Sequence, residues 1–327
     1  MWRYILKRLV TTFFLLFAVV FIVYLIMEFT PGDPVMIKLG TNYTPEAYET
    51  TRHNLGLDKP FLTRYFLFVK NALLNFSFGA SYNGRDVLTE ILSRAPRSML
   101  IAFGSIILAT IFGIIFGITA AINHSKWKDN VTMIVALFGI SIPDFWIGLM
   151  LSIIFSLKLR WLPASGFYGA KYLILPVVTC SFNTMGIVAR MTRSSMLEVI
   201  RQDYITTAKA KGQSRRNIIF KHALKNALIP IITVVGTQTS YMMGGVMVVE
   251  TVFSIGGMGT LMMESINALD YPMVLGCVIF ASVIACVVIL ITDIAYAFVD
   301  PRIRAQYQGR KKKKKTENTN LDVEVTV

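Results

Sequence analysis

The residue types that most often carry chemistry are sparse in this chain. The three histidines, His53, His124 and His222, stand in predicted loops, and no His-Glu-x-x-His or Cys-x-x-Cys pattern indicates a metal site. The sequence contains neither a Gly-x-Ser-x-Gly elbow nor a Gly-x-x-x-x-Gly-Lys-Ser/Thr phosphate loop. We therefore predict no catalytic residue, no metal site and no cofactor bound by this chain.

The three cysteines, Cys180, Cys277 and Cys286, lie within long apolar stretches, where a thiol behaves as a small apolar side chain. Cys277 and Cys286 are nine residues apart. At about 100° per residue they would face opposite sides of a helix. We expect neither a disulfide framework nor a metal-binding pair.

Three carboxylates inside the apolar stretches are candidates for function, because a charged side chain deep in lipid is costly. Asp144 follows Pro143, which frees backbone carbonyls, so this pair could line a polar path or serve a hydrogen bond within a helix bundle. Glu250 is a second path candidate, or a carboxylate hydrated at the outer end of its helix. Asp293 is expected to pair with loop arginines.

Small and flexible residues indicate two further features. Gly113 and Gly117 form a small-xxx-small pair, which is typical of close helix packing. Met243 and Gly244 lie in a segment rich in methionine and glycine, which could repack around varied substrates on the same path. Plain core filling is the alternative for this segment.

The elements that carry these residues are membrane spans. The chain of 327 residues is 54% hydrophobic, and its mean hydropathy of +0.57 is too high for a water-soluble domain. An apolar block of roughly 20 residues must be helical to cross lipid, because unpaired backbone amides are costly there. We predict an all-α membrane protein with about six such spans, at 9–29, 98–121, 131–157, 173–190, 229–250 and 273–298. The first block has a basic head like a secretory signal, but it lacks a small-residue cleavage site and is expected to stay as a span.

The basic residues predict the orientation. With both termini in the cytoplasm, the inner segments hold 22 of the 33 Lys and Arg residues, as the positive-inside rule requires. The net charge of +14 is spread over loops that border lipid, so we expect a bilayer partner and no nucleic acid. The tail beyond residue 301 contains Arg310 and five lysines, and we predict a disordered segment on anionic lipid or a solvated tail without a partner.

The loop between the fourth and fifth spans is the most informative segment. Asp203 could cap a short helix, Gly212 could end it in a left-handed conformation, and Ser214 could cap a second helix. Small side chains flanked by basic ones suit the docking of another protein, although an ordinary basic loop is the alternative. The residues predicted to take part are Asp203, Tyr204, Thr207, Ala208, Ala210, Lys211, Gly212 and Arg215.

The order of residues in this loop resembles the EAA loop of a known family. Asp-Tyr, then Ala-x-Ala-Lys-Gly, a basic stretch and His-Ala-Leu-x-Asn-Ala-Leu-Ile-Pro all stand between Asp203 and Pro230. This run is similar to that of inner-membrane permeases in binding-protein-dependent ATP-binding-cassette importers of the oligopeptide, dipeptide and nickel group. Two departures are Thr206-Thr207-Ala208 for Glu-Ala-Ala, and Ile255-Gly256-Gly257 where Pro-Gly is common.

The resemblance covers nearly the whole chain and implies an architecture. It implies a type I importer permease fold with a first segment and span (1–30), an external loop region (31–97), a permease core (98–300) and a basic tail (301–327). The core would hold the coupling loop, at about 191–228. The other matching segments are Thr30–Pro34, Phe78–Ser81, Ser141–Trp146, Glu250–Phe253, Asp270–Pro272, Asp293 and Asp300–Arg304.

The resemblance also implies partners and a cargo. A second related permease, two ATPase subunits that hold ATP and Mg, and an external binding protein would complete the transporter in a bacterial or archaeal cytoplasmic membrane. Alternating access would carry short peptides, with nickel or glutathione as alternatives, along a path that includes Pro143, Asp144, Met243, Gly244 and Glu250. A different reading is a membrane channel or scaffold that needs no ATPase.

Overall fold

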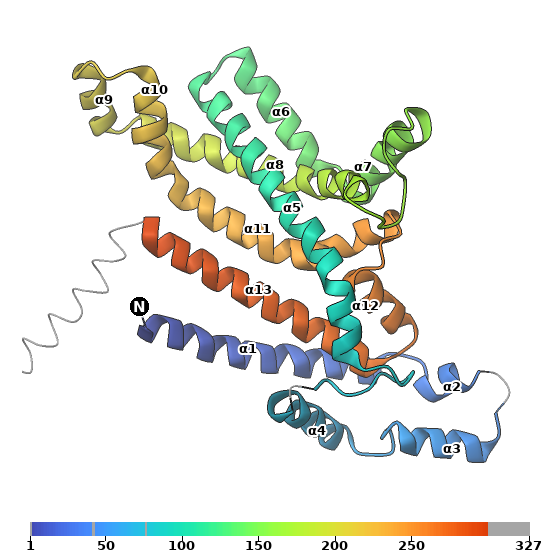
Figure 1. Cartoon of the computed structure of the whole chain (residues 1–327). Helices are drawn as coiled ribbons and strands as arrows, with labels where there is room; N and C mark the ends of the chain where they lie inside the picture. The colour runs from blue at the N-terminus through green and yellow to red at the C-terminus, as the bar shows by residue number, and fades with distance from the viewer. Residues whose placement is uncertain (1, 41–42, 76, 300–327) are drawn as a thin grey trace, which may run out of the picture.

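The computed structural model describes residues 2–40, 43–75 and 77–299, and these form an extended array of helices (Figure 1). The long helices are α1 (Trp2–Phe29), α5 (Val87–Ile122), α6 (Trp127–Ser141), α8 (Lys171–Ile200), α11 (Lys225–Val252) and α13 (Tyr271–Val299). The shorter helices and π-helical segments are α2 (Pro34–Leu39), α3 (Pro45–Asn54), α4 (Phe61–Leu74), α7 (Asp144–Leu151), η1 (Ser152–Lys158), α9 (Asp203–Ala210), α10 (Arg215–Asn217), η2 (Ile218–Leu224) and α12 (Met258–Asn267).

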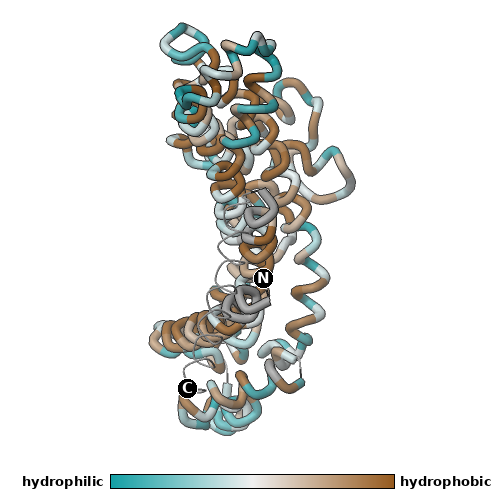
Figure 2. The backbone as a smooth tube through the Cα atoms, turned by 90° about the vertical axis from the view of Figure 1, so that its left-hand side faces the viewer, coloured by the Kyte–Doolittle hydropathy of each residue, from teal (hydrophilic) through white to brown (hydrophobic). Residues whose placement is uncertain are grey.

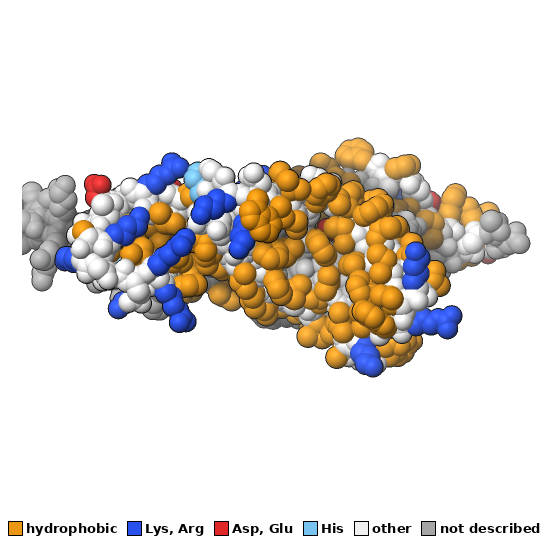
Figure 3. Space-filling view, turned by 90° about the horizontal axis from the view of Figure 1, so that it is seen from above, with side chains coloured by type: hydrophobic (Ala, Val, Ile, Leu, Met, Phe, Trp, Pro, Cys, Tyr) orange, Lys and Arg blue, Asp and Glu red, His pale blue; other side chains and the backbone are white. Residues whose placement is uncertain are grey.

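The described helices confirm a membrane protein with several spans. Four of them are long and apolar enough to cross a bilayer, namely Val87–Ile122, Lys171–Ile200, Arg215–Met242 and Tyr271–Thr292. In α1 the apolar stretch Phe13–Phe29 is shorter. Hydrophobic segments fill the middle of the tube in Figure 2, while hydrophilic residues gather in the loops at its ends. Figure 3 shows the same pattern on one surface, where a wide apolar area lies between groups of Lys and Arg.

The third predicted span is the main correction to the fold. A single helix over 131–157 is wrong, because α6 ends at Ser141 and the following pair, α7 and η1, turns away by 103°. Ile142 and Pro143 are extended between them, as expected for a proline and the residue before it. We call this bend, from Ser141 to Asp144, the elbow.

Close helix packing holds the core together. α5 lies along α8, and the glycine pair of α5 makes this possible: a Cβ built on Gly117 would lie 2.4 Å from Cβ of Thr192. A Cβ on Gly113 would lie 2.8 Å from Val188. The predicted packing role of both glycines is confirmed. α6 and α11 cover other sides of α8, and α13 packs against α11 and α1.

The described residues between α1 and α5 lie at one end of the molecule (Figure 1). α4 packs on α1 through Tyr65, which is 1% exposed and meets Tyr24 edge to face. The segment before α5 is tied to the start of α13, because Asp270 accepts hydrogen bonds from the Ser81 hydroxyl and from the Tyr82 backbone N–H. Asp86 caps α5 and accepts hydrogen bonds from Thr89, which lower the pKa of its carboxyl.

Candidate functional site

The predicted coupling loop is a compact pair of helices at one end of the molecule, α9 and α10 (Figure 1). Gly212 has φ +74° and follows the end of α9, which confirms its predicted left-handed conformation. Ser214 caps α10, because its hydroxyl accepts a hydrogen bond from the backbone N–H of Asn217 at 3.3 Å. The loop therefore has the two-helix form that its sequence predicts.

Two details of the loop differ from prediction. Gln202 occupies the cap position of α9, and Asp203 is its first helical residue, where a carboxylate still interacts favourably with the helix dipole. Ala208 is 8% exposed and packs with the fully buried Ile205 into the loop's own apolar core. Ala208 is therefore not on a docking surface. A sequence of small residues does not show which side of a one- to two-turn helix faces inward.

The remaining predicted docking residues are exposed together. The exposed residues lie on α9, in the turn after it and at the start of α10, and they are Asp203, Tyr204, Thr207, Ala210, Lys211, Gly212 and Arg215. We call this set the coupling surface. A Cβ at Gly212 would meet no atom within 4 Å, so another protein could approach the backbone closely there. Its role in docking stays a prediction.

Hydrogen bonds tie the loop to the membrane helices. The Asn226 side-chain amide donates to the Tyr204 hydroxyl at 2.9 Å, which joins α9 to the start of α11. The Arg215 guanidinium reaches the backbone carbonyl of Ile122, at the end of α5, at 3.4 Å. The loop is thus connected to the turn between α5 and α6, as well as to its own neighbours in sequence.

An ion pair next to the loop was not predicted. Arg193 of α8 donates from Nε and Nη2 to the two carboxylate oxygens of Asp129, on α6, at 2.6 and 2.7 Å. Asp129 is 2% exposed, and its carboxylate also accepts from the Ser125 backbone N–H at 3.0 Å and lies 3.3 Å from Nδ1 of His124. We call these residues the inner clamp. In the sequence, Asp129 and Arg193 are only two opposite charges at the ends of apolar blocks. They are 64 residues apart, so the sequence does not show that they form an ion pair.

A cavity of about 320 Å³ opens at the protein surface beside the elbow. It lies between the elbow, α8 and α11. Its polar lining residues are Asp144, Asn183, Thr184, Gln238 and Tyr241, and its apolar ones are Ile140, Cys180, Ile187, Met242 and Val246. Ligand pockets usually have volumes of roughly 300 to 1,000 Å³, so this space suits a small molecule.

The candidate path residues fall into three groups around this cavity. Asp144 lines it, and Pro143 sets the bend that places Asp144 there. Gly244 lies on α11 just beyond Met242 and faces open space, since a Cβ there would meet no atom within 4 Å. The Met243 side chain lies outside the described residues. The roles of Pro143, Asp144, Met243 and Gly244 in the path stay predictions. The Asp293 side chain, which is expected to pair with loop arginines, also lies outside the described residues, so that expectation stays a prediction too.

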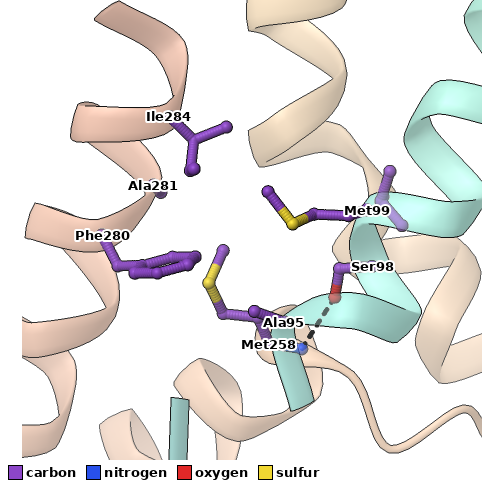
Figure 4. Close-up of a pocket in the computed structure, with 8 residues that line it drawn as sticks. Ala95, Ser98, Met99, Met258, Phe280, Ala281 and Ile284 are labelled. Atoms are coloured by element: carbon purple, nitrogen blue, oxygen red, sulfur yellow. Dashed lines mark hydrogen bonds between the residues drawn. The ribbon is translucent and has the colours of Figure 1, made fainter. Parts of the chain in front are cut away.

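Glu250 has a different environment from the one expected. It is 0% exposed, so hydration at a membrane surface is wrong. Its carboxylate accepts a hydrogen bond from the Ser98 hydroxyl, and from the backbone N–H and hydroxyl of Thr260 at 3.0 and 3.3 Å. Ser98 in turn accepts from the Met258 backbone N–H at 2.8 Å, beside a small gap that Met99 also lines (Figure 4). Glu250 therefore joins α5, α11 and α12 and does not line the cavity.

Comparison with known protein families shows to which family this chain belongs. Residues 113–305 match the family described as binding-protein-dependent transport system inner membrane component, and residues 1–102 match the N-terminal family of the same membrane components. The chain belongs to this family. It is a multi-pass permease subunit of an ATP-binding-cassette importer, which confirms the resemblance drawn from the coupling loop. Membership favours the importer over the channel or scaffold alternative.

Individual relatives are similar over almost their full length. This permease is 36% identical over 305 residues to the glutathione transport system permease protein GsiC of Escherichia coli strain K12, covering 93% of this chain and 99% of the relative. It is 37% identical over 313 residues to the dipeptide transport system permease protein DppB of Bacillus subtilis strain 168, covering 94% and 99%.

Solved structures support the fold. The inward-facing MetNI methionine ABC transporter matches 65% of this permease and 98% of its own chain, with a TM-score of 0.56 and 15% identity. A second crystal form of MetNI gives a TM-score of 0.54. At this identity the likeness shows the fold alone, and it confirms the predicted type I importer permease architecture.

Proposed function

We propose that this permease imports short peptides through the cavity beside the elbow. The observation that carries the proposal is the lining of that cavity, in which one carboxylate, two side-chain amides and two hydroxyls stand among apolar side chains. Amides and hydroxyls can donate to and accept from a peptide backbone of any sequence, while the apolar part tolerates varied side chains. The relatives named for dipeptide and glutathione transport support a cargo of this size.

The proposed orientation places the coupling surface in the cytoplasm. The start of α1 and the end of α13 lie on the same side of the molecule as α9, whereas α2 and α3 lie on the other (Figure 1). This arrangement and the distribution of basic residues support inner termini and an external region made of α2, α3 and α4.

The proposed mechanism is alternating access driven from outside this chain. Two ATPase subunits, which hold ATP and Mg, would dock on the coupling surface and on its counterpart in a second, related permease. An external binding protein would deliver the peptide. Closure of the ATPases on ATP would carry α9 with it, and the inner clamp would pass that movement to α6 and the elbow.

Uptake in cells tests the cargo. Cells lacking this chain are given labelled di-, tri- and pentapeptides, glutathione and nickel, with and without the chain restored on a plasmid. We expect uptake of the short peptides to be lost and then rescued, with the pentapeptide weakest because the cavity is small. Unaltered peptide uptake, together with loss of glutathione or nickel uptake, would contradict a general peptide importer and assign the alternative cargo.

A further inference from the structure

Asp144 has a carboxylate oxygen that no described residue satisfies. Its Oδ1 atom is buried and accepts no hydrogen bond from any residue that the structure describes. It is also the one acidic or basic residue among the described residues that line the cavity. A carboxylate oxygen withdrawn from water without a donor is unfavourable, so such a group calls for an outside cation or donor.

The local structure does not supply that donor. Asp144 is the first residue of α7, where the helix dipole favours a negative charge. That field stabilises the charge but leaves Oδ1 without a hydrogen bond. The Asn183 side chain also lines the cavity, and the hydrogen bond that it donates among the described residues goes to the Ile140 carbonyl at 3.3 Å and not to Asp144.

The acceptors around Asp144 favour an ammonium group over a metal ion. One carboxylate falls short of the several charged oxygen ligands that Ca²⁺ or Mg²⁺ takes. An ammonium carries three donors and one charge, and the cavity lining holds one carboxylate, on Asp144, and two side-chain amides, on Asn183 and Gln238, whose oxygens are acceptors of the kind that an ammonium needs. The apolar wall that includes Met242 and Val246 leaves room for the rest of the molecule.

We infer that Asp144 is the recognition subsite for an ammonium group of the cargo, the N-terminal amine of a short peptide or a lysine side chain. This inference rests on the proposed peptide import. It assigns to the permease its own selection for a positively charged amine, separate from whatever an external binding protein selects. A cargo with this group would enter the cavity more tightly than the same molecule without it.

The test measures occupancy of the cavity directly. The complete transporter is assembled without nucleotide or binding protein. The three cysteines of this permease are replaced by alanine, and Ile187→Cys on the cavity wall serves as the reporter for alkylation. The probes are Ala-Phe, acetyl-Ala-Phe and acetyl-Lys-Phe, which present an N-terminal ammonium, none, and a side-chain ammonium. We expect Ala-Phe to protect the reporter at roughly 10- to 100-fold lower concentration than acetyl-Ala-Phe, as loss of a charged hydrogen bond requires. Protection by acetyl-Lys-Phe at a similarly low concentration would show that a lysine side-chain ammonium binds, and weak protection would show that only the N-terminal ammonium binds.

The variants separate recognition from damage to the elbow. Asp144→Asn should remove the preference for the free amine, whereas Phe145→Leu, next to it but not lining the cavity, should keep it. Equal protection by all probes with Asp144 in place would overturn the inference, as would an unchanged preference in Asp144→Asn. If Asp144→Asn does not assemble, the comparison of probes with Asp144 present still decides. Uptake of Ala-Phe by cells with the unmodified chain is measured alongside, because its absence would overturn peptide import itself.

Discussion

Gly212 combines a left-handed backbone conformation with a position on the predicted docking surface. It has φ +74° at the exposed end of α9, with open space where a Cβ would stand. Gly212→Glu adds strain and places a bulky negative charge on the coupling surface, so we expect uptake to fall at least about tenfold while ATP hydrolysis continues. The measurement is peptide imported per ATP hydrolysed in proteoliposomes.

Asparagine provides the control at the same position. It adopts the left-handed region more readily than other side chains and carries no charge, so Gly212→Asn should transport nearly as well as the unmodified chain. Full, coupled transport by Gly212→Glu would show that this face of the loop does not dock an ATPase.

Glu250 gives a prediction about stability. Gln has nearly the same shape, but it replaces one acceptor oxygen by an NH₂ group that faces the hydroxyl and N–H donors of Ser98 and Thr260. We expect Glu250→Gln to destabilise the purified permease by about 1 to 3 kcal/mol, seen as a lower thermal unfolding temperature in detergent. Glu264→Gln, at a 58% exposed side chain on α12, is the matched control and should change little. Equal unfolding temperatures for both variants would refute the structural role of Glu250.

The residue scale also shows what the sequence could not reveal. Gly212 and Ser214 were predictable because their conformations depend on neighbours in the chain. The burial of Ala208 and Glu250 depends on which elements pack around them, and Glu250 meets Ser98 across 152 positions. The sequence shows that Glu250 lies at the end of an apolar stretch. It does not show whether water or protein hydrogen-bond donors surround the carboxylate.

The inner clamp gives the element-scale prediction. Arg193 and Asp129 join α8 to α6 beside the coupling loop, and the far end of α6 is the elbow. If α6 transmits the movement of the loop, Asp129→Asn should lower peptide import per ATP by roughly fivefold or more, the scale of a typical coupling free energy. ATP hydrolysis with and without peptide is measured in the same vesicles.

A second ion pair provides a matched control for the clamp. Arg64 donates to both oxygens of Glu28 at 2.6 and 2.7 Å, the same lengths as in the clamp, but this pair joins α4 to α1. Glu28→Gln should leave the ratio of import to hydrolysis unchanged. If both variants lower the ratio equally, the clamp acts only through general stability.

Substitutions at Gly117 and Gly244 distinguish a glycine needed for helix packing from a glycine that lines the transport path. Gly117→Leu should prevent assembly, because its side chain would overlap Thr192 and the Ala189 carbonyl where α5 meets α8. Gly244→Leu points into open space, so we expect assembly to persist and uptake to fall as the route beside Met242 narrows. Copurification of the subunits and peptide uptake are measured for both. Normal uptake by Gly244→Leu would exclude Gly244 from the path.

For the secondary-structure elements, the sequence predicted which segments are helical better than it predicted where the helices bend. Apolar blocks identify segments that must be helical in lipid, and four long helices agree with the predicted spans. The block over 131–157 was also recognised as apolar, and Pro143 as a source of free carbonyls. The turn of 103° could not be predicted, because a proline in a span produces anything from a slight kink to a break, depending on what packs around it.

The whole molecule places three working parts along one axis. α9 and α10, which carry the coupling surface, are at one end, and α2, α3 and α4 are at the other (Figure 1). The cavity lies beside the elbow, where its lining includes Ile140 and Asp144. α6 and α8 reach from the clamp to this cavity. In the proposed mechanism, this arrangement links a movement at the loop to a change in access to the cavity.

The most direct measurement is transport by the reconstituted system. This permease is placed in vesicles with the proposed second permease and ATPase subunits, and labelled Ala-Phe and the proposed binding protein are supplied outside the membrane. We predict accumulation against a gradient that needs ATP, the binding protein and this chain together. Dipeptide entry that proceeds without ATP, or no dipeptide accumulation while another cargo is concentrated, would contradict the account.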